Sequence, residues 1–262
     1  MFAKLDLKWV YQQRTMRYFI PEWDDRVDPN YDFTIDGITP DRDPYNHDVY
    51  AHEIYSTPNY DGVLVSKSVI EENKTKKARI ESIGIHKHVR VPRDFPVFGD
   101  CGAFNYIDQE FPPFETEETV NFYQNLDFDY GVSIDHLIVP SMLKRNAYAL
   151  VDADGNEEPI NEESASQYEA DGYTVKKRPR SRDMFAEDKL IYTWEEEYLD
   201  EAKRRWKLTL DNAKNFIETH KRFGAKFTPI AGCQGWDPES QAEMFKEQQN
   251  MGYDYGGIFF CY

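Results

Sequence analysis

Cysteine is scarce in this sequence and apolar runs are short. The three cysteines in 262 residues, Cys101, Cys233 and Cys261, are scattered, odd in number and form no C-x-x-C pair. This pattern argues against a disulfide framework and against a sequence-encoded zinc site. No apolar run approaches the roughly 20 residues that a membrane-spanning helix needs, and residues 1–17 lack the apolar core of a secretory signal. We therefore expect a cytoplasmic chain without membrane contact.

Positive charge is also in short supply, and the formal net charge is −17. Phosphate contacts need Lys and Arg, so the overall charge argues against a general nucleic-acid binder. The basic residues are unevenly spread, however, and Pro179 interrupts a basic run at residues 176–182, which predicts a loop. We expect the cations of this run to contact nucleic-acid phosphates: Lys176, Lys177, Arg178, Arg180 and Arg182. Two other basic clusters, 74–79 and 203–205, are more typical of solvated helix or loop faces.

Short apolar runs alternate with amphipathic helical segments along most of the chain. The expected strands cover residues 16–20, 62–66, 87–91, 94–100, 129–135 and 227–232, and a further strand starts at residue 252. The expected helices cover residues 69–83, 116–126, 193–220 and 238–251. This alternation indicates βαβ units and a parallel sheet.

The chain is expected to form one large α/β domain over residues 16–262, preceded by an N-terminal extension at residues 1–15. The βαβ rhythm is interrupted at about residues 140–190. The phrase "YALVDADGNEEPI" in this region predicts a β-hairpin with a tight Asp-Gly turn. We therefore expect a hairpin insertion within the domain.

Three of the expected strands end in polar residues that stand beside small ones. Asp100 lies in "GDCGAF", Asp135 in "SIDH" and Gln234 in "GCQGW". In a parallel sheet or barrel, ligands gather at the carboxyl ends of the strands. Phe104 lies four residues after Asp100 and could cover one face of a flat ligand. Such a ligand could approach the backbone closely at the glycines in positions 99, 102, 232 and 235.

A purine-like base suits this set of side chains. Carboxylates accept hydrogen bonds from ring N–H and amine groups, whereas a glutamine amide both donates and accepts. Stacking of an aromatic ring on a base contributes roughly 1–3 kcal/mol. The alternative is that each aspartate only caps the helix that follows it. His136 either orients a neighbour at the strand end or simply packs, and Cys101 and Cys233 are either reactive thiols or small packing residues.

These motifs resemble those of a known enzyme family. "GDCGAF" resembles the D-S-G-G-F/Y segment of tRNA-guanine transglycosylases, "SIDH" their second base-reading aspartate segment, and "GCQG" their V-Q-G segment. The phrases "FIPEWDDRVDPNYDF", "DVYAHEIY", "GVLVSKS" and "QGWDPES" are more similar to the bacterial and phage branch that inserts 7-deazaguanine bases into DNA. The resemblance spans about residues 16–256. It implies a TIM-type (β/α)8 barrel that exchanges guanine for a 7-deazaguanine without breaking the sugar-phosphate backbone.

The resemblance also implies a role for each matched residue. Asp100 would contact the base and act as an acid or base, and Phe104 would stack on the base. Asp135 would read the N1 and exocyclic amine edge, and Gln234 the carbonyl. The substrate-binding set would be completed by Cys101, Gly235, Gly256 and Gly257. In the implied two-step reaction, an aspartate attacks the ribose anomeric carbon and the incoming base then displaces the enzyme.

The sequence departs from the family pattern in three ways. The nucleophilic aspartate of the family lies on a later strand end without a counterpart here, so Asp135 is the alternative nucleophile. The cysteine and histidine zinc site of the tRNA enzymes has no counterpart either, so no cofactor is expected. The barrel is expected to be truncated after about six strands, near "GGIFFCY". A second chain that supplies the missing strands is therefore an expected partner, beside DNA and the free 7-deazaguanine base.

Two other functions remain open at this point. One is the same base exchange with tRNA as the acceptor, against which the missing zinc module argues. The other is a non-catalytic half-barrel that recognises a base or nucleic acid and works only with a partner chain.

Overall fold

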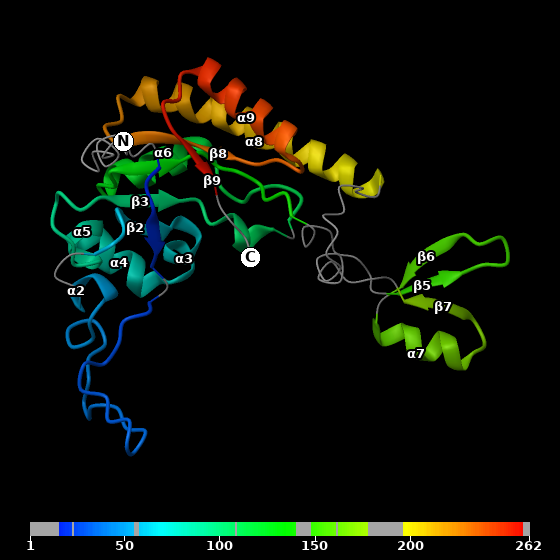
Figure 1. Cartoon of the computed structure of the whole chain (residues 1–262), viewed down its shortest axis with the longest axis horizontal. Helices are drawn as coiled ribbons and strands as arrows, with labels where there is room; N and C mark the ends of the chain where they lie inside the picture. Colours follow the sequence, from blue (N-terminus) through cyan, green and yellow to red (C-terminus); the bar gives the residue numbers. More distant parts are fainter. Residues whose placement is uncertain are drawn as a thin grey trace, which may run out of the picture. The chain divides into compact units, whose positions relative to one another are not determined.

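The protein packs as two units that each combine distant parts of the sequence. The computed structural model describes residues 16–22, 24–54, 58–107, 109–139, 148–160, 162–177 and 196–258 (Figure 1). The first unit comprises Met1–Gly102, Glu115–Val132 and Thr219–Ile230. The second comprises Ala103–Phe114, Ser133–Glu218 and Ala231–Tyr262. The expected N-terminal extension lies outside the described residues.

Six strands form one parallel sheet in the order β1-β2-β3-β4-β8-β9. Their bounds are Phe19–Pro21 (β1), Gly62–Ser66 (β2), Val97–Asp100 (β3), Tyr130–Val132 (β4), Thr228–Cys233 (β8) and Gly256–Ile258 (β9). Helices alternate with these strands along the chain. The predicted α/β class with a parallel sheet is therefore confirmed, in an arrangement of half TIM-barrel type. Truncation of a complete (β/α)8 barrel stays a prediction.

Short helices connect the strands of the first unit. They are α2 (Ala51–Ile54), α3 (Lys67–Glu72), α4 (Lys74–Ile83), α5 (Ile85–His88) and α6 (Thr116–Asn125). Ile70, Ile80 and Tyr123 place their side chains fully inside this unit. The single helix predicted after β2 is divided at Asn73, because the Asn73 side chain accepts a hydrogen bond from the backbone N–H of Lys76 and so caps α4.

The strand predicted at residues 87–91 is wrong. Residues Ile85–His88 form α5 instead, and the backbone N–H of Val89 donates to Ile85 O at 3.0 Å. Polar and apolar residues alternate here as they do in a strand. Ile85 and Val89 are nevertheless both fully buried four residues apart, which is helical spacing.

Two of the basic clusters each contain one buried cation, so the prediction of solvated faces is wrong for Lys76 and for Arg205. Lys76 is 1% exposed, and its Nζ donates to Glu22 Oε2 at 2.7 Å and to Asp24 Oδ2 at 3.1 Å. Arg205 is 3% exposed. Burying a charge is costly unless it is paired and hydrogen-bonded. The burial of each of these two cations therefore has to be explained by its partners.

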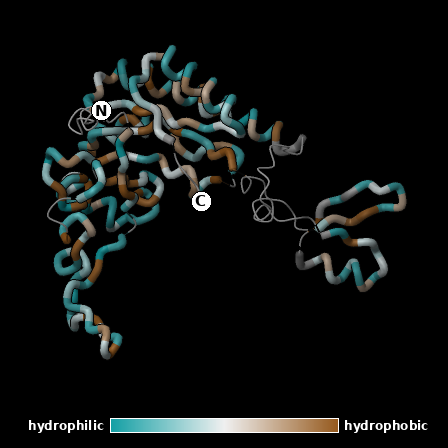
Figure 2. The backbone as a smooth tube through the Cα atoms, in the orientation of Figure 1, coloured by the Kyte–Doolittle hydropathy of each residue, from teal (hydrophilic) through white to brown (hydrophobic). Residues whose placement is uncertain are grey.

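The second unit contains most of α8 (Glu196–Phe223) and all of α9 (Pro238–Met251). Hydrophilic and hydrophobic residues interleave along α8 (Figure 2). The buried residues recur every three or four positions, namely Ala202, Arg205, Thr209, Ala213 and Phe216. Trp206 Nε1 donates to Ser240 O at 3.0 Å and so joins the two helices. Among the described residues no helix, α8 included, is both long enough and apolar enough to cross a membrane.

An antiparallel sheet of order β6-β5-β7 also lies in the second unit. Its elements are β5 (Tyr148–Val151), β6 (Glu157–Ile160), α7 (Glu162–Ala170) and β7 (Thr174–Lys177). β5 and β6 are the two strands predicted around the Asp-Gly turn, in which Asp152 accepts from the backbone N–H groups of Asp154 and Asn156. β7 adds a third strand that the sequence pattern does not predict. That this sheet is an insertion into a barrel stays a prediction.

The basic run at 176–182 is described only in part. Lys176 and Lys177 end β7, so the predicted loop is wrong for these two residues. The side chain of Lys176 is exposed. The other cations of the run lie outside the described residues: Arg178, Arg180 and Arg182.

Candidate functional site

Two polar side chains meet in the interior of the second unit. Gln234 Nε2 donates a hydrogen bond of 2.6 Å to Asp135 Oδ2. Asp135 is 1% exposed and Gln234 is 6% exposed. Asp135 lies three residues after β4, and Gln234 directly follows β8. The structure thus brings together two of the three residues that the strand-end pattern singles out.

The Gln234 amide is held at both of its polar atoms. Its Oε1 accepts from the backbone N–H of Ile138 at 3.2 Å, while its Nε2 donates to Asp135. A reversed amide would set its carbonyl against the carboxylate and its NH2 against the Ile138 N–H. Gln234 is therefore fixed as a donor toward Asp135, and the pair is a charge-assisted hydrogen bond when Asp135 is ionised.

The glycines beside this pair make room for protein atoms. A Cβ on Gly232 would lie 2.9 Å from Asp135 Cβ, and a Cβ on Gly235 would lie 2.7 Å from the backbone N of Gln241. Side chains likewise fill the space beside two glycines of the first unit, Gly99 and Gly102. Protein atoms therefore occupy the side of each of these four glycines where a Cβ would stand, and close approach of a flat ligand to their backbone stays a prediction. A backbone contact between Gly235 and a ligand stays a prediction.

Side chains hold the backbone on both sides of Asp135. The Tyr106 hydroxyl donates to Asp135 O at 3.0 Å, and the backbone N–H of His136 donates to Thr209 Oγ1 at 3.0 Å. Tyr106 and Thr209 are both buried. No helix begins among residues 133–139, so Asp135 is not a helix cap. These contacts pre-organise the carboxylate that the motif resemblance assigns to base reading.

His136 orients its neighbours rather than only packing. Its Nε2 lies 2.9 Å from Gln109 O, and its Nδ1 lies 2.9 Å from Arg205 Nη1. A guanidinium only donates, so Nδ1 must accept and the ring proton sits on Nε2. Burial, reinforced by the charge of Arg205, lowers the pKa of His136 to about 4. His136 is therefore neutral near pH 7 and is held in one tautomer.

Asp100 and Phe104 belong to different units. Asp100 ends β3 in the first unit, and its Oδ2 accepts from the backbone N–H of Gly102 at 2.9 Å, a contact within its own turn. Phe104 lies in η1 (Ala103–Tyr106) of the second unit and is 53% exposed. A single hollow lined by Asp100, Phe104, Asp135 and Gln234 therefore stays a prediction.

The glycine pair Gly256-Gly257 lies in β9. Gly256 is in register with Ala231 of β8, and Gly257 is in register with Gly232. A Cβ on Gly256 would lie 2.2 Å from Phe245 Cε1, so this glycine is required for packing against α9. Contact of either glycine with a substrate stays a prediction.

Thiol chemistry has little support in the described residues. Cys101 and Cys233 are both buried. Burial, reinforced by the charge of Asp135 and opposed by a hydrogen bond with the Gln241 side chain, raises the pKa of Cys233 to about 12. A thiol that resists ionisation is a poor nucleophile near pH 7, so packing is the better reading of Cys233. In the described part of the chain, no group of three or more His, Cys, Asp or Glu side chains is placed to hold a metal ion.

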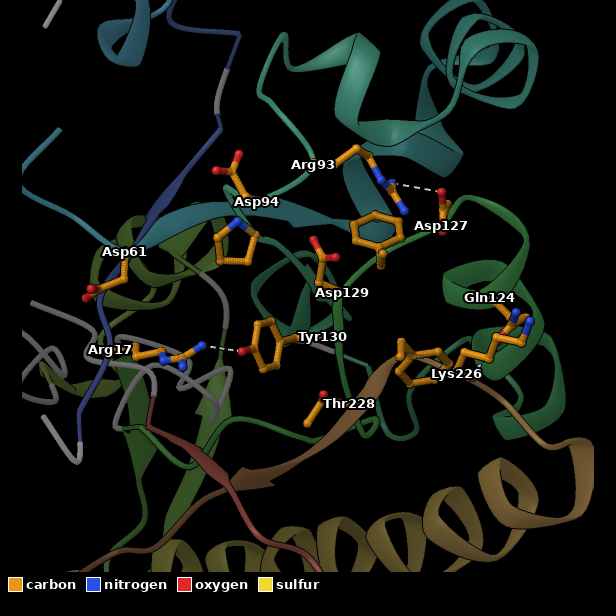
Figure 3. Close-up of a pocket in the computed structure, with 13 residues that line it drawn as sticks. Arg17, Asp61, Arg93, Asp94, Gln124, Asp127, Asp129, Tyr130, Lys226 and Thr228 are labelled. Atoms are coloured by element: carbon orange, nitrogen blue, oxygen red, sulfur yellow. Dashed lines mark hydrogen bonds and ion pairs between the residues drawn. The ribbon is translucent and has the colours of Figure 1, made fainter. Parts of the chain in front are cut away.

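A cavity of about 760 Å3 lies in the first unit, at the amino ends of the strands (Figure 3). Its lining includes residues at or just before the starts of β3, β4 and β8, among them Asp94, Asp129, Tyr130 and Thr228. Some of its charges are paired within the wall, as Arg93 is with Asp127 at 2.8 Å. The predicted site is at the carboxyl ends of the strands, so this cavity is not that site.

The chain is similar to a protein of known name. No family model matches it. A DNA-guanine transglycosylase from Salmonella montevideo is 29% identical to it over 246 residues, which is 91% of this chain. The chain spans about half of that relative, 47% of its length. This similarity supports the transglycosylase family that the strand-end motifs imply.

Proposed function

We propose that this chain takes part in base exchange in DNA, in which guanine is replaced by a 7-deazaguanine derivative. The similarity to a DNA-guanine transglycosylase over 91% of the chain carries the proposal. The name of that relative specifies guanine as the base and DNA as the nucleic acid. The incoming 7-deazaguanine, and action in the cytoplasm of a bacterial or phage-infected cell, come from the resemblance of the motifs. The buried hydrogen-bonded pair of Asp135 and Gln234 supports base recognition.

Base recognition follows from the donors and acceptors of this pair. A guanine-type base presents an N1–H, an exocyclic amine and a carbonyl on one edge. In the proposal, Asp135 accepts from the N1–H and the amine, and Gln234 donates to the carbonyl with the Nε2 hydrogen that does not face Asp135. An adenine-type base would set its amine against the Gln234 NH2. Two facing donors are unfavourable, so the pair selects guanine-type bases.

The exchange itself needs a carboxylate at the sugar. That carboxylate attacks C1′, the C1′–N9 bond breaks, and guanine leaves with the bonding electrons and gains a proton from an acid. The incoming base loses its N9 proton and attacks C1′, which releases the carboxylate. We assign the proton transfers to Asp100. Asp135 cannot contact the base edge and C1′ at once, so the proposal assigns the attack on C1′ to a carboxylate other than Asp135.

The proposal is tested by following label into nucleic acid. The chain is incubated with radiolabelled 7-deazaguanine and either duplex DNA or tRNA, alone and together with the half of the relative that has no counterpart here. The nucleic acid is then digested to nucleosides. Label in deoxynucleosides, abolished in Asp135→Asn, supports the proposal. Label in tRNA alone contradicts DNA as the acceptor.

A second candidate function is base recognition without exchange by this chain alone. The extent of the match favours it, since the chain covers 47% of the relative and the exchange of the whole relative can depend on the remainder. Calorimetric binding of free 7-deazaguanine, combined with no label in either nucleic acid in any mixture, would favour this candidate over base exchange.

A further inference from the structure

Arg205 joins the two segments that carry the proposed base contacts. It lies on α8 and is 3% exposed. Its Nη2 donates to Ile107 O at 2.9 Å, and its Nη1 donates to Leu137 O at 3.0 Å. Ile107 lies three residues after Phe104, and Leu137 lies two residues after Asp135. One guanidinium therefore ties the segment of the stacking ring to the segment of the base-reading carboxylate, within one unit.

The charge of Arg205 is compensated inside the protein. Glu201 Oε1 accepts from Arg205 Nε at 2.7 Å. Hydrogen bonds from Arg204 and from Arg205 outweigh burial and lower the pKa of Glu201 to about 2, so this carboxylate stays ionised. Well-packed apolar residues often stabilise a fold as much as a buried ion pair does. Stability alone therefore does not explain why an arginine occupies this position. Its hydrogen bonds in fixed directions toward two carbonyl groups do explain it.

His136 carries the restraint from Arg205 to Asp135. Its ring bridges the same two segments, since Nδ1 accepts from Arg205 and Nε2–H donates to Gln109 O. Its backbone N–H is bound to Thr209 on α8. The residue next to Asp135 is thus fixed at three atoms, and Asp135 has little freedom to turn.

We propose that Arg205 and His136 are positioning residues that set the affinity and the base selectivity of the Asp135–Gln234 pair without touching the base. The inference rests on the proposed function. A polar site recognises its ligand well only when its side chains already point in the productive direction. Without these restraints Asp135 would sample several directions, and binding would have to order it first.

The test compares variants by calorimetric titration with 7-deazaguanine and with 7-deazaadenine. Arg205→Met and His136→Phe are expected to raise the Kd for 7-deazaguanine about 10-fold, the lower end of what removal of an orienting partner costs in metal sites. Both are also expected to lower the preference over 7-deazaadenine. His136→Asn keeps an oxygen that can accept from Arg205 and should recover most of the affinity. Lys207→Met, an exposed change on the same helix, should leave both Kd values unchanged.

Calorimetry separates a positioning role from a purely structural one. A variant that only unfolds part of the protein lowers the binding stoichiometry but leaves the Kd and the selectivity as they are. Unchanged Kd and selectivity in Arg205→Met, with normal binding by the parent chain, would overturn the inference and leave the proposed function intact. A parent chain that binds neither base would instead overturn base recognition itself, and the inference with it. Should Arg205→Met fail to fold, equal affinity of His136→Asn and His136→Phe decides against the inference.

Discussion

The Gln234 amide and the Asp135 carboxylate share a hydrogen bond of 2.6 Å across 99 residues of sequence. Leaving either group buried without a partner would cost about 1–3 kcal/mol or more, so each group accounts for the burial of the other. The same bond places a donor beside an acceptor, and that order is complementary to the edge of a guanine-type base. Changes to this pair or to its surroundings should therefore alter both stability and base recognition.

Gln234→Glu tests the pair directly. The substitution keeps the shape of the side chain but sets two carboxylates 2.6 Å apart, where both cannot ionise at low cost. We expect the free energy of unfolding to fall by roughly 2–4 kcal/mol at pH 8 and by less at pH 5.5, where a shared proton restores a hydrogen bond. Urea denaturation at the two pH values measures this difference.

The matched control is Gln167→Glu on α7. Gln167 Nε2 donates to Asp171 in the same way, at 3.1 Å, but in an exposed position. Water screens the new carboxylate there, so the loss should stay below about 1 kcal/mol. Equal losses at the two positions, or no pH dependence for Gln234→Glu, would show that the buried pair is not electrostatically coupled.

Gly232→Ala is expected to displace Asp135. The new methyl group would lie 2.9 Å from Asp135 Cβ and 3.2 Å from its Cγ, which is too close for both to keep their places. Overpacking of this kind typically costs about 1–3 kcal/mol, and base affinity should fall at least as much as stability. Gly224→Ala is the control, because its φ of +61° strains the backbone but its Cβ would meet open space. Loss of affinity in both variants alike would argue against a specific effect on Asp135.

The strands could be predicted from sequence because the interior of the sheet leaves a plain signal. Residues of β2, β3 and β8 are mostly buried, and each of these strands contains a short run of apolar residues. The segment Ile85–His88 has no such run. The residues Val89-Arg90-Val91 that follow it alternate as strand residues do, yet residues 85–88 fold as a helix, in which Ile85 and Val89 are both buried four residues apart. Tertiary packing determines the conformation of this segment, and no local sequence pattern predicts it.

The candidate site could be predicted in part for the same reason. Asp135 and Gln234 stand out because each is a polar residue that follows an apolar run. Arg205 stands in the run Lys203-Arg204-Arg205, which suggests a solvated face. One signal was available, since Arg205 stands at helical spacing, three residues after the apolar Ala202. Its partners were not predictable, because the two carbonyl groups that it binds are 98 and 68 residues away in the sequence.

Mild acid is expected to destabilise the protein through histidines that are neutral in the folded state. Burial lowers the pKa of His52 below 6.5 and that of His88 and His136 to about 4. Below pH 6.5 the unfolded chain therefore binds protons that the folded chain binds only at lower pH, at about pH 4 in the case of His88 and His136. The contribution of these histidines to the free energy of unfolding should be fully present above pH 6.5 and should be lost as the pH drops toward 4. Urea denaturation between pH 4.5 and 7.5 measures the slope.

His88→Leu isolates one of these groups. The charges of Lys76, Arg26 and Arg79 lower the pKa of His88, and the charge of Asp24 opposes them. Neither ring nitrogen of His88 has a hydrogen-bond partner among the described residues. The slope of stability against pH should become shallower by up to about 1.4 kcal/mol per pH unit, the contribution of one proton. An unchanged slope would mean that His88 takes up its proton without cost in the folded state.

The basic run at 176–182 is predicted to contact DNA phosphates. Alanine at Lys176, Lys177, Arg178, Arg180 and Arg182 should make the negative slope of log affinity against log salt shallower, by about 0.9 for each phosphate that is no longer neutralised. A control replaces exposed lysines of α8, namely Lys203, Lys207 and Lys214. Both variants lower the positive charge, but only the first should change the slope. Similar slopes in the two variants would remove the run from the DNA interface.

A crystal structure of the chain with 7-deazaguanine bound tests base recognition most directly. We expect the N1–H and the exocyclic amine of the base within about 3 Å of the Asp135 carboxylate, its carbonyl at Gln234 Nε2, and the Phe104 ring over its face. A base bound in the cavity beside Asp94 and Asp129, or anywhere out of reach of Asp135 and Gln234, would contradict the proposed function.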